Sequence, residues 1–137
     1  MSLELSFEKM VNYDTRKAGI SLSVELRLGE LSSVFEAKID TGSTFWVFER
    51  SYGEKLGLNI EAGERQRIAT TVGSFLTFGH WATLTVEDFT FDSMVFFARD
   101  ENHRRNVLGR FGWLNRVLIG INDYDGKLYL SRYENDI

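Results

Sequence analysis

The sequence predicts a mostly β, barrel-like domain with one or two short helices. Apolar and polar side chains alternate over several short segments, most clearly over residues 20–28, and a period of two is typical of half-buried strands. Turn-forming pairs such as Gly29-Glu30 and Asp125-Gly126 separate these segments. The chain has 137 residues, which fits one domain that can bury a core without disulfides or metal.

The first half of the chain predicts a hairpin that ends at a carboxylate. A strand over residues 20–28 turns at Gly29-Glu30, and alternation resumes over residues 35–39, directly before Asp40. The continuous apolar run at 45–48 predicts a strand buried on both faces. Residues 49–56 then predict a short helix that ends at Gly57, because glycine readily takes the left-handed conformation that ends helices.

The second half predicts further hairpins. Threonine, valine and aromatic residues recur over 68–86 around Gly73 and Gly79, which indicates a long hairpin. The remaining expected elements are strands at 89–91 and 94–98 with a turn at Asp92-Ser93, a polar loop at 99–106, one or two helical turns at 111–115, and closing strands at 117–121 and 127–131.

The two ends are expected to differ from the domain between them. Residues 1–16 form an N-terminal arm in which Leu3, Leu5 and Phe7 alternate with polar residues, so the arm is expected to add a strand. Residues 17–132 make up the domain itself. Residues 133–137 are expected to be a frayed C-terminal tail.

Composition narrows the classes of function. Twenty acidic and sixteen basic residues give a net charge of −4, which argues against a nucleic-acid partner. No cysteine is present, which excludes thiolate catalysis and agrees with a reducing compartment, so a cytoplasmic protein without a membrane span is expected. His80 and His103 are the only histidines, too few and too far apart to predict a metal site or a cofactor.

Asp40-Thr41-Gly42-Ser43 is the segment that points to chemistry. It follows one apolar strand and precedes another, so the carboxylate is expected on a tight turn inside the domain. Gly42 permits close approach of the backbone, and Thr41 and Ser43 offer hydroxyl groups. The same residue types also form ordinary Asx-turns, so these four residues alone leave both interpretations open.

The downstream sequence resembles the retropepsin-like aspartic proteases. In that family a strand delivers Asp-Thr-Gly, a flap hairpin follows, and a motif of two apolar residues and glycine packs behind the catalytic loop. Here Asp40-Thr41-Gly42 is followed by the 68–86 hairpin and then by Val107-Leu108-Gly109-Arg110, and the resemblance covers residues 20–131. It implies a small closed-barrel acid-protease domain over 17–132, with Asp40 as the catalytic carboxylate.

The resemblance also assigns roles to other positions. By it, Thr41, Gly42 and Ser43 form the active-site loop, and the tip of the flap is either at Val72-Gly73-Ser74-Phe75 or nearer Phe78-Gly79-His80. The residues expected to support the active site from behind are Val107, Leu108, Gly109 and Arg110. Ser43 stands where the retroviral enzymes usually have alanine. We expect its hydroxyl to donate a hydrogen bond to the carboxylate, which would shift an activity optimum toward acid.

One catalytic carboxylate in each chain implies two chains. This chemistry needs two carboxyl groups around one water molecule, and Asp123-Tyr124-Asp125-Gly126 is no second copy of the motif. We therefore expect a homodimer that pairs two Asp40 residues and hydrolyses a polypeptide substrate as an aspartic endopeptidase. The alternatives are a non-catalytic dimerisation or peptide-binding module on the same fold, and a small-ligand barrel.

Overall fold

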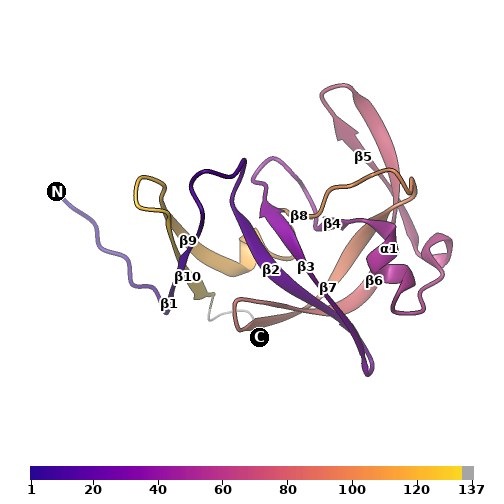
Figure 1. Ribbon diagram of the computed structural model, residues 1–137, viewed down its shortest axis with the longest axis horizontal. Helices are drawn as coiled ribbons and strands as arrows, with labels where there is room; N and C mark the ends of the chain where they lie inside the picture. Colours follow the sequence, from indigo (N-terminus) through magenta and orange to yellow (C-terminus); the bar gives the residue numbers. More distant parts are fainter. Residues whose placement is uncertain (134–137) are drawn as a thin grey trace.

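The computed structural model describes residues 1–133, and strands dominate it (Figure 1). The elements in chain order are β1 (Lys9–Asn12), β2 (Ser21–Leu28), β3 (Leu31–Ile39), β4 (Val47–Phe48), α1 (Arg50–Glu54), the 3-10 helix η1 (Ile60–Ala62), β5 (Glu64–Thr70), β6 (Gly73–Val86), β7 (Phe89–Ala98), β8 (Val107–Leu108), the 3-10 helix η2 (Leu114–Arg116), β9 (Val117–Asn122) and β10 (Lys127–Arg132).

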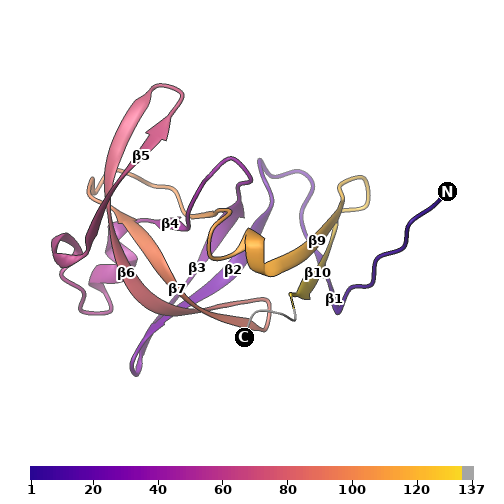
Figure 2. The same ribbon diagram turned by 180° about the vertical axis from the view of Figure 1, so that it is seen from behind.

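Seven strands form one sheet that closes on itself. Their order is β2-β3-β8-β4-β7-β6-β5, and β2 also pairs with β6, so the sheet becomes a ring. Only β5 lies outside this ring, where it pairs with β6 to form a hairpin that projects from the barrel (Figures 1 and 2). The predicted fold class, a mostly β closed barrel with few short helices, is confirmed.

A second sheet of three strands, in the order β1-β10-β9, holds both ends of the domain. The N-terminal arm does add a strand, but it forms at Lys9–Asn12 rather than over the alternating residues before it. Phe7 packs on Tyr129 with ring centroids 5.7 Å apart, whereas Leu3 and Leu5 are exposed. Of the expected C-terminal tail, only Tyr133 belongs to the described residues.

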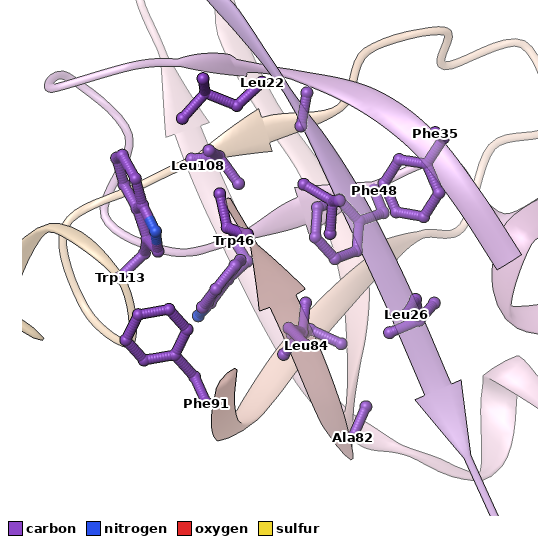
Figure 3. Packing of buried hydrophobic residues seen from close by; sticks show 14 of the residues in the cluster. Leu22, Leu26, Phe35, Trp46, Phe48, Ala82, Leu84, Phe91, Leu108 and Trp113 are labelled. Atoms are coloured by element: carbon purple, nitrogen blue, oxygen red, sulfur yellow. The ribbon is translucent and has the colours of Figure 1, made fainter. Parts of the chain in front are cut away.

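The barrel is filled by large apolar side chains from strands distant in sequence (Figure 3). Inward positions of β2 and β3 alternate with exposed ones, as the sequence pattern predicts. The two residues of β4 are both buried, as expected for a strand covered on two faces. The largest fully buried side chains include Trp46, Phe48, Phe91, Phe97, Leu108 and Trp113.

The expected turn at Asp92-Ser93 is wrong, because β7 is one continuous strand over Phe89–Ala98. Both polar side chains have hydrogen-bond partners: Thr83 Oγ1 donates to Asp92 Oδ1 at the surface (2.7 Å), and Trp46 Nε1 donates to Ser93 Oγ in the core (3.1 Å). The chain turns before β7 instead, at Glu87 and Asp88, which have φ values of 48° and 72°. Turn-forming residue types therefore predicted a turn in the interior of a continuous strand.

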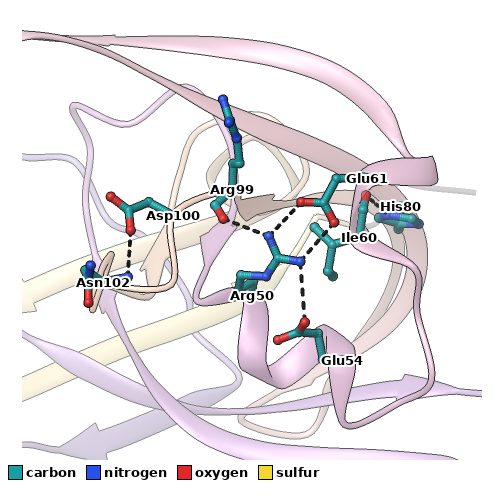
Figure 4. Close-up of polar contacts among 8 residues, drawn as sticks. All are labelled: Arg50, Glu54, Ile60, Glu61, His80, Arg99, Asp100 and Asn102. Atoms are coloured by element: carbon teal, nitrogen blue, oxygen red, sulfur yellow. Dashed lines mark hydrogen bonds and ion pairs between the residues drawn. The ribbon is translucent and has the colours of Figure 1, made fainter.

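The helices are short: α1 and η1 lie next to each other, whereas η2 lies at the start of β9. Within residues 1–133, none is long and apolar enough to cross a membrane. Arg50 at the start of α1 donates to Glu61 of η1 (2.7 and 2.9 Å) and to the carbonyl of Arg99 after β7 (2.7 Å) (Figure 4). Glu61 chiefly, with Glu54, raises the pKa of Arg50. This cluster fixes the start of the 99–106 loop.

Candidate active site

Asp40 lies one residue beyond the end of β3, and the strand behind it sets its position. β3 pairs in parallel with β8, with Lys38 opposite Val107 and Ile39 opposite Leu108. The Asp40 amide continues this ladder by donating to the Leu108 carbonyl (3.0 Å). The main chain that carries the carboxylate is therefore anchored to a fully buried strand.

The four residues from Asp40 to Ser43 form a compact Asx-turn. The Gly42 amide donates to Asp40 Oδ1 (2.9 Å), and the Ser43 amide donates to the Asp40 carbonyl (3.1 Å). Within residues 1–133, the other carboxylate oxygen, Oδ2, has no hydrogen-bond partner. Asp40 is half-buried while Thr41 and Gly42 are exposed, so the turn presents one free carboxylate oxygen at the surface of the domain.

Ser43 does not interact with the carboxylate as expected. Its hydroxyl donates to the carbonyl of Phe45 (2.9 Å), and a hydroxyl group has only one hydrogen to donate. The predicted hydrogen bond from the Ser43 hydroxyl to the Asp40 carboxylate is therefore wrong, and so the structure gives no reason to expect an acid-shifted activity optimum. Instead, Ser43 stabilises the chain that leads from the turn into β4.

Gly109 packs against the back of this loop at very short range. A Cβ atom at this position would lie 2.2 Å from the Phe45 carbonyl oxygen and 2.6 Å from its carbon. Next to this contact, the Arg110 amide donates to Ser43 O (2.9 Å) and the Phe111 amide to Thr44 O (2.8 Å). Only glycine permits this approach, so the loop 40–45 and the segment 109–111 form one backbone unit.

A cavity of about 730 Å³ lies beside the turn. Its walls come from the loop after β3, from β5 and the start of β6, and from the 99–106 loop. Figures 1 and 2 both show the β5–β6 hairpin and the loop between β3 and β4 at the same end of the molecule. The residues that line it are Asp40, Gly42, Ser43, Thr44, Phe45, Val47, Gln66, Arg67, Ile68, Ala69, Thr70, Phe75, His103, Arg105 and Val107.

The β5–β6 hairpin reverses at Thr71 and Val72, because Thr70 pairs with Gly73. Thr70 Oγ1 closes the turn: it donates to the Gly73 carbonyl (3.2 Å) and accepts from the Val72 amide (3.3 Å). The Val72 side chain is almost fully exposed. The other position considered for the tip, residues 78–80, lies in the barrel, where it pairs with β7.

The structure brings part of the predicted set together at the cavity and spreads the rest around it. Asp40, Gly42, Ser43, Phe75 and Val107 line the cavity. Leu108 and Gly109 are buried behind the loop, and Arg110 is exposed. The remaining residues of the set lie outside the cavity: Thr41 beside a second, smaller hollow, and Val72, Gly73 and Ser74 at the tip of the hairpin.

Sequence reasoning missed the contribution of the 99–106 loop. The His103 ring stacks on Phe75, with centroids 4.7 Å apart and planes 24° from parallel. Burial chiefly, and then Arg105, lowers the pKa of His103, while Asp100 and Glu49 act in the opposite direction. A short basic run in a polar loop looks like a solvated segment. Its proximity to the hairpin depends on tertiary pairing that one sequence does not reveal.

Within residues 1–133, no three His, Cys, Asp or Glu side chains are placed to hold a metal ion together. Among the described residues, Asp40 is the one carboxylate that lines the cavity.

The fold is shared with proteases of known structure. The EIAV protease, solved with the inhibitor HBY-793, superposes with a TM-score of 0.56 at 18% identity, covering 73% of this chain and 88% of that one. The retropepsin-like fold is thereby established. The retroviral protease-like domain of Ddi1 from Leishmania major gives a TM-score of 0.52 at 17% identity, covering 88% of this chain and 100% of that one. No protein-family model and no curated protein sequence matches the retropepsin-like chain.

Proposed function

We propose that this retropepsin-like chain is an aspartic endopeptidase that acts as a homodimer. The proposal depends mainly on the placement of Asp40, which is held by backbone hydrogen bonds on a glycine-supported turn at the edge of a large cavity. Ordinary Asx-turns need no such cavity. A non-catalytic dimerisation or peptide-binding module would need neither a free carboxylate oxygen nor its position at the cavity wall.

The chemistry needs a second carboxylate close to the first. Two Asp40 side chains across a two-fold axis would share one proton, because like charges at hydrogen-bond distance resist ionising together. The ionised member would act as general base on a bound water molecule. The protonated member would donate to the scissile carbonyl and later help to protonate the leaving amine. The monomer alone would be inactive.

The surface around the turn supports pairing of two copies. Thr41 borders a hollow of about 290 Å³ together with Arg110, Phe111, Leu114 and Asn115. Phe111 is an aromatic residue with 51% of its surface exposed, and large exposed apolar groups often mark contact surfaces. A two-fold axis through the turn would bring this same surface of each subunit against its copy.

An extended polypeptide is the substrate that suits the cavity. Within the described chain, β5 pairs only with β6, so its other edge has free backbone groups at the cavity wall. Extended peptides bind such edges through main-chain hydrogen bonds. The β5–β6 hairpin would act as a flap over the bound peptide, with Val72, Gly73, Ser74 and Phe75 at or near its tip.

Cleavage of a denatured protein mixture by three proteins tests the proposal. We expect wild type and Glu101→Gln to cleave, and Asp40→Asn to be inactive while keeping the wild-type melting temperature. Glu101 is exposed and lies outside the cavity, so it is a matched control for loss of a carboxylate. Equal inactivity of all three proteins would favour the non-catalytic module.

Mixing wild type with Asp40→Asn tests the shared site. At fixed total protein, an equimolar mixture that exchanges subunits leaves about one quarter of the dimers with two Asp40 residues, so activity should fall to about one quarter. A catalytic monomer would retain about one half. Sedimentation of each protein alone should show a dimer, and a strict monomer with full activity would refute the proposal.

A further inference from the structure

The charge of the cavity differs from that of the whole chain. The chain carries a net charge of −4, yet the charged residues that line the cavity are two arginines, Arg67 and Arg105, and one carboxylate, Asp40. Asp40 lies on the loop after β3, whereas Arg67 lies on β5 and Arg105 on the 99–106 loop. The two arginines therefore belong to different segments of the cavity wall from the loop that carries the Asp40 carboxylate.

Neither arginine is neutralised by a neighbouring acid. Within residues 1–133, the Arg105 guanidinium makes no ion pair or hydrogen bond. Arg67 makes one long hydrogen bond, from Nη1 to Ser74 Oγ (3.3 Å). Arg16, Arg27 and Arg50, by contrast, are each paired with a carboxylate. Arginines that line a cavity without an acidic partner are available to a ligand, and a guanidinium binds a carboxylate through two parallel hydrogen bonds.

An apolar surface lies beside the 99–106 loop that carries Arg105, whereas Arg67, opposite Leu76, is on the other face of the hairpin. Ile68 and Phe75 are cross-strand neighbours on the hairpin, and His103 stacks on Phe75. Burial lowers the pKa of His103, which favours the neutral form of its ring. A side chain with a short aliphatic stem and an acidic head matches this combination of an apolar surface and guanidinium groups.

We propose that this wall is a specificity subsite that binds an acidic side chain of the substrate near the bond to be cleaved. Arg105 is the main specificity-determining residue and Arg67 the second. The inference rests on the proposed function and adds the substrate class: an extended polypeptide with glutamate or aspartate close to the scissile bond. A two-fold axis would repeat the subsite, so acidic residues would be favoured on either side of that bond.

Peptide binding to the Asp40→Asn variant tests the subsite without relying on cleavage. The probes are three fluorescein-labelled decapeptides of one apolar sequence, with two Glu, two Gln or two Lys residues flanking the central bond. We expect the Glu peptide to bind about tenfold more tightly than the Gln peptide and the Lys peptide to bind most weakly. Raising the salt concentration should reduce these differences, because screening weakens exposed charge pairs.

Neighbouring arginines provide matched controls. Arg105→Gln and Arg67→Gln, each added to Asp40→Asn, should shrink the preference for the Glu peptide to about threefold or less. Arg104→Gln and Arg65→Gln change adjacent exposed arginines that do not line the cavity, and they should keep the preference. Equal binding of the Glu and Gln peptides, no binding of any peptide, or the same loss in the control variants would overturn the inference.

Cleavage-site sequencing separates this inference from the proposed function. If wild type cleaves a denatured protein mixture, sites should be enriched in Glu or Asp at a fixed distance from the cut, and Arg105→Gln should remove the enrichment. Cleavage without that enrichment would refute the proposed subsite but would support the proposed endopeptidase activity. Selective binding of the Glu peptide without any cleavage would support the subsite and refute the proposed endopeptidase activity.

Discussion

The loop 40–45 and the β5–β6 hairpin face the same cavity but are held in opposite ways. The loop is joined by main-chain hydrogen bonds to the segment 108–111. The hairpin tip at Thr71 and Val72 is exposed and is stabilised mainly by its own turn. The comparison indicates that one side of the cavity is built for fixed geometry and the other for movement over a ligand.

Gly109 beside the loop and Gly73 at the hairpin tip illustrate this difference between a fixed and an exposed side of the cavity. At Gly109 an added Cβ would collide with backbone atoms of Phe45, whereas at Gly73 no atom lies within 4 Å of an added Cβ. At position 73 the backbone conformation itself favours glycine, because other residues rarely adopt its φ of 151°. Gly109 therefore permits close packing of two backbone segments, whereas Gly73 permits the backbone conformation at the hairpin turn.

The largest effect is expected from Gly109→Ala. The new methyl group would force the loop 40–45 away from the segment 109–111, because the atoms it meets belong to the backbone and cannot rotate aside. We expect a loss of about 3 kcal/mol in the free energy of unfolding and loss of cleavage through displacement of Asp40. Denaturant unfolding monitored by tryptophan fluorescence, together with the cleavage assay, measures both. A variant of wild-type stability would show that this contact imposes no constraint.

Gly73→Ala should separate activity from stability. The added methyl group fills open space, so we expect a stability loss of only about 1–2 kcal/mol from backbone strain. Cleavage should fall by more than this stability loss explains, because the tip of the hairpin is altered. Gly29→Ala is the control: Gly29 has a positive φ of 58° and open space around it, in the β2–β3 turn far from the cavity. Equal activity of the two variants would refute a functional hairpin tip.

The same comparison explains what the sequence could predict. Local alternation identified β2 and β3, and Asp40 followed as the residue after a strand. These are properties of consecutive residues, which one sequence contains. The glycine after Leu108 was also predicted to support the loop, although only through a family resemblance, and its contact distance to Phe45 came from the structure.

The misplaced and missed features depend on partners distant in sequence. Asp92 and Ser93 look like turn residues until Thr83 and Trp46 supply their hydrogen bonds. The Ser43 hydroxyl was expected to donate to the Asp40 carboxylate but donates to the Phe45 carbonyl, and local sequence does not show which acceptor is used. Arg105 faces the cavity because the 99–106 loop lies beside β5 and β6, which is a tertiary contact.

A smaller effect is expected where the hairpin contacts the 99–106 loop. Phe75→Leu keeps an apolar side chain but removes the ring that stacks on His103, at a cost of about 1 kcal/mol. The hairpin would then lose a link to the 99–106 loop, and amide hydrogen exchange of β5 should accelerate more than that of β2. Leu76→Ala provides a comparison on the opposite face of β6. Unchanged exchange in β5 after Phe75→Leu would mean that the stack does not restrain the hairpin.

The smallest effect concerns the pH dependence of stability. Burial, and then Arg105, lowers the pKa of His103 below its ordinary value of 6.5, and this outweighs Asp100 and Glu49. The unfolded chain therefore binds a proton at this residue more readily than the folded chain. Its contribution to stability is complete above the unfolded pKa and is lost as pH falls through the lowered folded pKa.

His103→Phe isolates that contribution, because it keeps a ring against Phe75 and removes the titrating group. Between about pH 7 and 5, the wild-type free energy of unfolding should fall more steeply than that of the variant. Carboxylates that titrate in this range affect both proteins alike, so the difference between the two curves reports His103. Parallel curves would mean that the ring is as accessible to protons in the folded chain as in the unfolded one, and the stacked, half-buried position beside the hairpin would then be incorrect.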